Sequence, residues 1–358
     1  MSDKPPTSNL ATYKKVGNTD AALRRGWHAV ALSREVTATP LHVSLLGDDW
    51  VLVRLPGENG PELTAFVDRC PHRFAPLSAG WVEGDTLRCP YHGWCFKADG
   101  ACTEIPSQTT SERGADGQRE RIPPRARATA PWGVTEQAGI VFLAPEEPVA
   151  DIPDLSIAAD DSFLHGVLEA VRARAGAGLV IDNFIDMAHF PYVHAATIGT
   201  EEATAFDDLE VTREGFVMTA VGEHPFPNHE DPGVAEGIRP LLQRRRLTYE
   251  YRAPFLATLT IEYVEAGGVN VLHFFVQPED EHHCRVYTLL HRNDLDGDVG
   301  RLAEAVAFET KILEEDVALQ ERFVELTLPV DPTAEVHVRA DRPSLEYRRI
   351  LADLLELA

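Results

Sequence analysis

The sequence has no long hydrophobic segment. Among its 358 residues there is no apolar run of about eighteen or more, the length that a membrane-spanning helix requires. The first residues, Met1 to Asn18, are polar and lack the apolar core of a signal peptide. The sequence therefore predicts a cytoplasmic protein with no membrane partner.

Basic residues are scarce. The chain has 33 lysines and arginines against 57 aspartates and glutamates, which gives a formal net charge of −24. A surface of this charge repels the phosphates of nucleic acids. We therefore expect no nucleic-acid partner.

Cysteine is also scarce, and it is unevenly distributed. Five cysteines in a chain of this length do not form a disulfide framework. Four of them lie between Cys70 and Cys102, and clustered cysteines in a cytoplasmic protein indicate metal or redox chemistry. The chain also has no Gly-x-Gly-x-x-Gly motif, so we expect no flavin or nicotinamide site. Electrons for a redox reaction must then come from another protein.

The pattern of hydrophobic residues predicts an α+β protein. An N-terminal arm (1–23) precedes residues 24–145, whose short apolar segments between turn residues predict an all-β domain. Residues 146–358 predict a second domain, an antiparallel sheet packed against helices. Its predicted strands lie at 203–226, 246–264, 269–276 and 284–291, and its predicted helices at 179–189 and 301–326.

Two short loops combine cysteine with histidine. Cys70-Pro-His72 is followed, after sixteen intervening residues, by Cys89-Pro-Tyr-His92, so each loop offers one thiolate and one imidazole. Structural zinc fingers usually pair cysteine with cysteine and histidine with histidine. A Rieske [2Fe–2S] centre instead has two thiolates on one iron and two imidazoles on the other. The pattern favours a [2Fe–2S] cluster, with zinc as the alternative.

A second group of candidate ligands lies at residues 182–194. On a helix, Asp182, Asp186 and His189 share one face. A bend at Pro191 would bring His194 back toward that face. Two histidines and a distant carboxylate form the facial triad of non-haem Fe(II) oxygenases.

The third ligand of such a triad should be a buried carboxylate. Asp316 lies on the apolar stripe of the helix predicted at 301–326. A charge there is costly unless it is paired or bound to a metal. Glu309 lies on the same stripe and is a competing candidate.

These motifs resemble those of the Rieske non-haem iron oxygenases. Their cluster motif is similar to the two cysteine–histidine loops, and their iron-binding pattern, Asn-x2-Asp-x2-His-x4-His, matches Asn183, Asp186, His189 and His194. The run Glu315-Asp316-x4-Glu321 resembles their C-terminal acidic motif.

The resemblance implies the cofactors and their ligands. A [2Fe–2S] cluster would be bound by Cys70, His72, Cys89 and His92. One Fe(II) would be bound by His189, His194 and Asp316. Asp186 would be the catalytic residue that bridges a ligand histidine of one subunit to His92 of the neighbouring subunit.

Length and motif spacing are most similar to the homotrimeric branch with the phthalate, vanillate and dicamba oxygenases. This resemblance implies a helix-grip-like catalytic domain, a homotrimer, and electrons from a reductase, a ferredoxin or both. It implies O2-dependent hydroxylation or oxidative demethylation of a small, aromatic or cyclic substrate. The alternatives are a cis-dihydroxylating dioxygenase, a Rieske electron-transfer protein without oxygenase chemistry, and a zinc-stabilised ligand-binding protein.

Other polar residues are weaker candidates. Asn183 and His273 are candidates for substrate contact, although His273 is almost equally well interpreted as a core histidine. Three arginines flank the cluster loops and could form a positive docking patch for a ferredoxin: Arg69, Arg73 and Arg88. The run Arg244–Arg246 could neutralise an acidic substrate, but a solvated face is the favoured interpretation.

Overall fold

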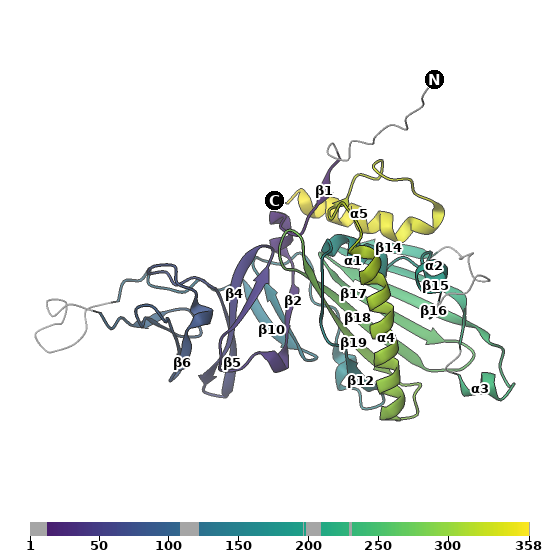
Figure 1. Ribbon diagram of the computed structural model, residues 1–358, viewed down its shortest axis with the longest axis horizontal. Helices are drawn as coiled ribbons and strands as arrows, with labels where there is room; N and C mark the ends of the chain where they lie inside the picture. Colours follow the sequence, from purple (N-terminus) through teal and green to yellow (C-terminus); the bar gives the residue numbers. More distant parts are fainter. Residues whose placement is uncertain (1–12, 108–121, 196, 198–208, 229–230, 358) are drawn as a thin grey trace, which may run out of the picture. The chain divides into compact units, whose positions relative to one another are not determined.

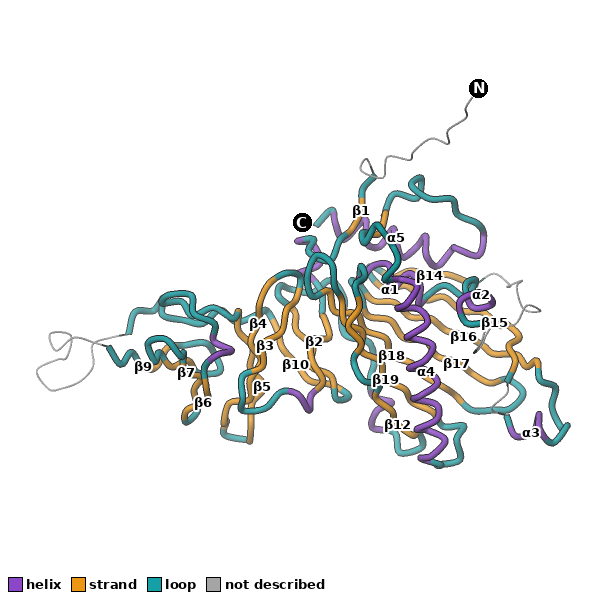
Figure 2. Tube along the Cα trace, in the orientation of Figure 1, coloured by secondary structure: helices purple, strands orange, loops and turns teal. Residues whose placement is uncertain are grey.

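The computed structural model describes residues 13–107, 122–195, 197, 209–228 and 231–357. The chain divides into two compact units (Figures 1 and 2). The smaller unit is the segment Arg24–Pro148, and the larger unit joins Met1–Leu23 with Val149–Ala358. Among the described residues, no helix combines the length and the hydropathy needed to cross a membrane.

The described part of the smaller unit consists of antiparallel sheets and short 3₁₀ helices. One sheet has the order β10-β11-β2, from Gly133–Gln137, Ile140–Ala144 and His28–Leu32. A second contains β3 (Leu41–Leu45), β4 (Asp48–Gly57) and β5 (Gly60–Val67). The third contains β6 (Trp81–Glu83), β7 (Thr86–Arg88), β8 (Cys95–Phe96) and β9 (Cys102–Glu104). The 3₁₀ helices are Ser33–Glu35 and Leu77–Ala79, with Ala21–Arg25 at the start of the unit. The predicted all-β character is confirmed.

Both candidate cluster cysteines belong to the core of the smaller unit. Cys70 follows β5 and Cys89 follows β7, and both are buried together with Phe66, Leu87 and Phe96. The loops that carry the candidate ligands are therefore anchored at their cysteines by apolar packing.

The larger unit is built on one antiparallel sheet with the order β12-β19-β18-β17-β16-β15-β14, and β13 also pairs with β19. Its strands are β12 (Leu164–Val167), β13 (Val171–Ala173), β14 (Glu210–Glu214), β15 (Val217–Pro227), β16 (Leu242–Arg252), β17 (Leu256–Tyr263), β18 (Val269–Pro278) and β19 (Cys284–Arg292). A separate pair joins β1 (Lys15–Val16) to β20 (Leu328–Pro329).

Helices cover one face of this sheet. The long helix α4 (Val299–Gln320) runs across the strands, and α1 (Ala177–Phe184) and α2 (Phe190–Val193) lie on the same face (Figure 1). α5 (Arg342–Leu355) packs against β14 and β15, and α3 (Pro232–Ala235) is a single turn. Further 3₁₀ turns are Ser156–Ala159 and Arg339–Asp341. The predicted antiparallel sheet packed against helices is confirmed.

Several predicted boundaries differ from the structure. The helix predicted at 179–189 ends at Phe184, and the helix predicted at 301–326 is Val299–Gln320. The latter begins where Asp298 caps it, accepting hydrogen bonds from the backbone of Gly300 and Arg301. It ends at Gln320, and the two leucines that follow are buried outside the helix, Leu326 in the segment leading into β20 and Leu328 in β20 itself.

The strand and arm predictions also need correction. The strand predicted at 246–264 is two strands, β16 and β17, since Ala253-Pro254 forms a turn between them. Of the strand predicted at 203–226, residues 203–208 lie outside the described residues. Of the N-terminal arm, residues 1–12 lie outside them too, whereas Lys15–Val16 is paired with β20 as part of the larger unit.

Candidate metal centres

The two cysteine–histidine loops have the same backbone construction. In each loop the residue four positions after the cysteine donates its N–H to the cysteine carbonyl: Phe74 to Cys70 at 2.9 Å and Gly93 to Cys89 at 3.1 Å. Phe74 and Gly93 both have left-handed φ values, 60° and 70°. Each cysteine N–H in turn donates to a carbonyl five residues later. The sequence predicted two equivalent ligand loops, and the backbone shows how they are formed.

The donor atoms of these loops suit an iron–sulfur cluster. The rings of His72 and His92 lie 4.4 Å apart, and the buried Nδ1 atom of each has no hydrogen-bond partner in the part of the chain that the structure describes. Burial, together with the neighbouring Cys89 thiol, raises the pKa of Cys70 to about 12. Thiolates in such a place need a compensating positive charge. Two orphaned imidazole nitrogens beside two buried thiols therefore fit a [2Fe–2S] cluster.

The arginines beside the loops have different environments. Arg88 donates to the Gly93 carbonyl at 2.9 Å and pairs with Glu83 and Glu104 at 2.6 and 2.9 Å. It therefore holds the second loop in place and is not a free surface cation. Arg69 and Arg73 are exposed, and the Arg69 guanidinium lies 3.7 Å from the centre of the Phe74 ring.

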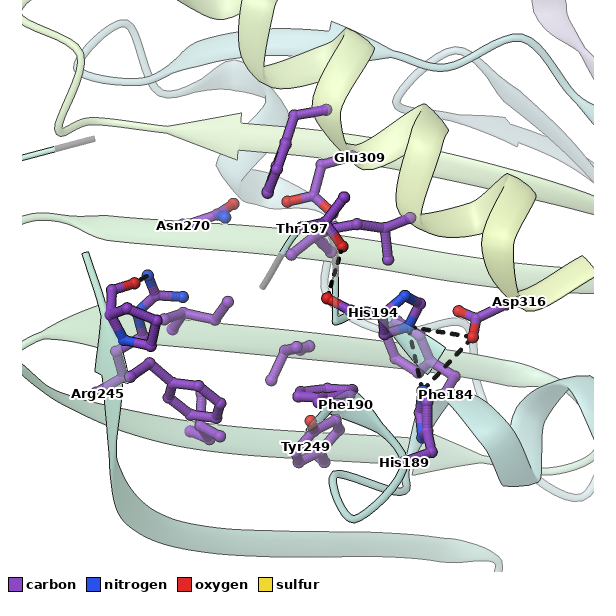
Figure 3. A pocket seen from close by; sticks show the side chains of 18 of the residues that line it. Phe184, His189, Phe190, His194, Thr197, Arg245, Tyr249, Asn270, Glu309 and Asp316 are labelled. Atoms are coloured by element: carbon purple, nitrogen blue, oxygen red, sulfur yellow. Dashed lines mark hydrogen bonds and ion pairs between the residues drawn. The ribbon is translucent and has the colours of Figure 1, made fainter. Parts of the chain in front are cut away.

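The second group of candidate ligands converges in the larger unit (Figure 3). The Nε2 atoms of His189 and His194 are 3.2 Å apart, and Asp316 Oδ1 lies 3.5 Å from the first and 3.2 Å from the second. Neighbouring ligands bound at about 2.1 Å and at right angles are about 3 Å apart. Apart from these two ion-pair contacts, the buried Asp316 Oδ1 has no hydrogen-bond partner among the described residues. The three atoms therefore fit one face of a metal ion.

The chain reaches this geometry by ending one helix and starting another. α1 ends at Phe184, and Asp186 then forms a turn in which its Oδ1 accepts the Ala188 N–H at 2.8 Å. His189 precedes α2, and Pro191 lies in the first turn of that helix, where a missing N–H is tolerated. The bend that sequence reasoning assigned to Pro191 is thus a helix start.

Two carboxylates orient the imidazoles. The Nδ1 atom of His189 donates to Asp186 at 3.2 Å, and that of His194 donates to Glu315 at 2.9 Å. Thr197 also donates to Glu315, at 3.0 Å. With Nδ1 as the donor, each Nε2 atom presents its lone pair to the other ligands. Glu315 was not predicted, although metal-binding histidines commonly need such a carboxylate partner.

The charge of this cluster favours a cation at its centre. Burial opposes protonation of His189, but its ion pairs with Asp186 and Asp316 raise its pKa to about 9. The pKa of His194 is also raised, because Asp316 and Glu315 outweigh the effect of its burial. A metal ion at this point would replace the proton.

The competing carboxylate and the other predicted residues lie elsewhere. Glu309 lines the cavity wall two helical turns before Asp316, apart from the three converging atoms. Asp182 turns away from the site and forms a bidentate ion pair with Arg348 of α5, at 2.6 and 2.9 Å. It cannot share a helical face with His189, because α1 has already ended.

Of the two candidate substrate residues, only Asn183 lines the cavity, and its Nδ2 lies 3.3 Å from His189 Nε2. His273 is buried on the opposite face of β18 from the cavity-lining Asn270 and Leu272. There it contacts Thr258 at 2.9 Å and packs against His291. The structure therefore favours the interpretation of His273 as a core histidine.

A cavity of about 350 Å³ opens beside the three converging ligands. Aromatic and aliphatic side chains from α1, α2 and the sheet form most of its wall: Phe184, Phe190, Phe226, Leu247, Tyr249, Leu259, Ile261, Tyr263 and Leu272. Helix α4 closes the other side with Phe308 and Ile312. A site of this size and composition suits a small, largely apolar organic molecule.

Comparison with known families agrees with this arrangement. Residues 26–122 match the Rieske [2Fe–2S] domain family. Residues 173–357, more than half of the chain, match the vanillate O-demethylase oxygenase C-terminal domain family. The chain belongs to the Rieske non-haem iron oxygenases. This Rieske oxygenase therefore carries a [2Fe–2S] cluster and a mononuclear iron, and it is the oxygenase component of a multicomponent system.

Relatives of this Rieske oxygenase include characterised demethylases and hydroxylases. It is 28% identical to methylxanthine N1-demethylase NdmA of Pseudomonas putida, over 93% of this chain and 90% of NdmA. The toluene-4-sulfonate monooxygenase iron–sulfur subunit TsaM1 of Comamonas testosteroni is 33% identical over 51% of this chain and 50% of its own. The crystal structure of NdmA with caffeine superposes with a TM-score of 0.78 at 27% identity, covering 95% of this chain and 93% of NdmA.

Proposed function

We propose that this Rieske oxygenase hydroxylates or oxidatively demethylates a small aromatic or cyclic substrate. The observation that carries the proposal is the position of His189, His194 and Asp316, whose converging donor atoms border an apolar cavity of about 350 Å³. Similarity to a methylxanthine demethylase and to a toluene-4-sulfonate monooxygenase supports this class of reaction.

The ligand assignment follows from the same geometry. His189, His194 and Asp316 would hold the mononuclear iron, and Cys70, His72, Cys89 and His92 would hold the cluster. An iron held by this triad would supply the activation of O2 next to a bound substrate. Asp186 and Glu315 keep the protons of both imidazoles on Nδ1, so that Nε2 can bind the metal.

The side chains of the cavity wall position the substrate. Phe184, Phe190 and Tyr249 offer flat surfaces near the histidines, against which a ring can stack. The Asn183 carboxamide beside His189 can hydrogen-bond to a polar substituent close to the reacting carbon. The apolar lining excludes bulk water, which protects reactive oxygen species from side reactions.

We further propose that the protein is a homotrimer in which Asp186 connects His189 to His92 of the neighbouring subunit. The Asp186 side chain is 33% exposed although it bonds to His189. Phe74 and Tyr91, in the cluster loops, are 63% and 64% exposed. Exposed aromatic side chains beside ligand loops are typical of a protein–protein interface.

Light scattering and rapid kinetics test the trimer. The native mass should equal three chains of 39.5 kDa. With iron supplied in excess so that both metal centres are filled, Asp186→Asn should slow oxidation of the reduced cluster on the order of 10- to 100-fold. A monomer with full activity, or an Asp186→Asn variant as fast as the wild type, would contradict the proposal.

The reaction itself is tested with a reductase and a panel of methoxyarenes, N-methyl heterocycles and aromatic acids. O2 uptake that depends on one compound, with formaldehyde or a hydroxylated product formed in proportion, is the expected result. His194→Ala should abolish uptake and preserve the visible spectrum of the cluster. If the product is a cis-diol, the reaction is dihydroxylation and not monooxygenation. O2 uptake that His194→Ala leaves unchanged would contradict the proposed iron site.

A further inference from the structure

Strand β16 separates three consecutive arginines between the two faces of the sheet. Arg244 and Arg246 point to the exposed face, where Arg244 pairs with Glu265 at 3.0 Å and Arg246 with Glu262 at 3.6 Å. Arg245, between them, must point to the opposite face. It lines the substrate cavity. The predicted solvated face therefore holds for two of the three residues and is wrong for Arg245.

The Arg245 guanidinium lies at the end of the cavity opposite the iron ligands (Figure 3). It sits between two rings, 5.4 Å from the centre of Phe226 and 5.2 Å from that of Tyr263. One of its Nη atoms donates to the Pro227 carbonyl at 3.2 Å. Its Nε–H is buried and has no acceptor among the described residues.

Arg245 has no carboxylate partner among the residues that the structure describes. The other arginine of the cavity, Arg292, is by contrast neutralised by Asp294 at 2.6 and 2.9 Å. A guanidinium has five N–H donors, and a single backbone carbonyl satisfies only one of them. Leaving such a charge partly buried and unpaired is costly. The structure therefore points to an anion supplied from outside the chain.

A second unsatisfied polar group lies on the same wall. Asn270 on β18 is 2% exposed, and no residue in the described part of the chain donates a hydrogen bond to its buried Oδ1. Its carboxamide borders the cavity together with Arg245. The end of the cavity far from the iron is thus polar, whereas the middle is formed by Leu247, Leu259 and Ile261.

We propose that Arg245 and Asn270 form a subsite for an anionic substituent of the substrate, a carboxylate or sulfonate. This inference rests on the proposed function and names its substrate class: an aromatic acid whose methyl or ring carbon faces the iron. Arg245 and Tyr249 are four residues apart on β16, which is about 13 Å along a strand. That length accommodates one or two rings between the anion and the reacting carbon.

Binding to the oxidised holoenzyme without reductase tests the subsite separately from catalysis. Calorimetry would compare 4-methoxybenzoate with 4-methoxybenzamide, and toluene-4-sulfonate with the corresponding sulfonamide. We expect the wild type to bind the anion of each pair about 10- to 100-fold more tightly, as for hydrogen bonds to a charged group. Arg245→Met should remove this preference, and Arg245→Lys should keep part of it. Arg244→Met, on the exposed face of the same strand, is the matched control and should behave as the wild type.

The outcomes separate this inference from the proposed function. The subsite would be refuted if the neutral compounds bind more tightly, if no anion binds, or if Arg245→Met keeps the wild-type preference for the anion. Each of these results would refute it even if O2 uptake with caffeine or another neutral compound is intact. Conversely, anions that bind through Arg245 in a protein that oxidises no bound compound would support the subsite and refute the oxygenase reaction proposed for it.

Discussion

Glu315 shows how a single residue can control a metal site without binding the metal. It lies one position before Asp316 on α4, so the two carboxylates point about 100° apart around the helix. Asp316 faces the Nε2 atoms of both histidines, whereas Glu315 accepts the proton on His194 Nδ1. One turn of helix thus supplies both a proposed iron ligand, Asp316, and the carboxylate that orients the proposed ligand His194.

Glu315→Gln should weaken iron binding on the order of 10- to 100-fold, because an amide orients the His194 ring less firmly than a carboxylate. Iron content measured after dialysis against a graded chelator series gives the affinity. Glu314→Gln is the matched control, since Glu314 is exposed on the same helix turn. Identical iron retention in both variants would show that Glu315 does not support the site.

At the scale of elements, α1 and α5 are joined by one partly buried ion pair. Arg348 of α5 is 4% exposed and binds both oxygens of Asp182 on α1. It also binds Glu335 at 2.8 Å. α1 leads directly into the turn that carries Asp186 and His189, so this pair fixes the start of the segment that we propose binds the iron.

Arg348→Met should destabilise the larger unit by about 3–5 kcal/mol, because it leaves the Asp182 charge unpaired. The unfolding midpoint of that unit in differential scanning calorimetry should fall by roughly 10 °C. Arg349→Met is the control, since Arg349 is exposed and its ion pair among the described residues is with Glu346 on its own helix, a contact worth less than about 1 kcal/mol. A shift as small as that of the control would contradict the role assigned to this pair.

Local motifs could be recognised from the sequence, but the faces of the sheet could not. The cysteine–histidine loops and His189/His194 are each contained in a few residues, so their spacing, together with the resemblance to the family motifs, predicts them as ligands. Alternation on β18 separates His273 from Asn270, yet both are buried, and the sequence does not say which face the helices cover. For the same reason, the sequence did not predict that Arg245 lines the cavity. The roles of these residues depend on tertiary packing.

At the scale of the whole molecule, the face of the sheet opposite the cavity contributes to stability. His165 and His291 contact each other at 2.8 Å through Nδ1, and His273 packs on His291. Burial lowers the pKa of His273 to about 3 and that of His291 to about 4, with a further contribution from the neighbouring histidine in each case. Both imidazoles are therefore neutral in the folded protein at pH 5.

Acid should therefore destabilise the protein, because His273 and His291 bind protons more readily in the unfolded chain than in the folded protein. In the unfolded chain they bind protons below about pH 6.5, so the free energy of unfolding falls as the pH drops from 6.5 toward 4. Each group contributes a slope of about 1.4 kcal/mol per pH unit. Calorimetry between pH 4 and 7 should show a weaker pH dependence for His291→Gln than for the wild type. The exposed His282→Gln is the control, and equal slopes in both variants would contradict this account.

Counting iron tests the central claim, that one chain holds two separate iron centres. A [2Fe–2S] cluster and one mononuclear iron require three iron atoms per chain. Iron analysis with the visible spectrum should give three in the wild type, and two with an unchanged cluster spectrum in the double variant His189→Ala/Asp316→Ala. Three irons retained in that variant, or loss of the cluster spectrum along with the iron, would contradict the assignment.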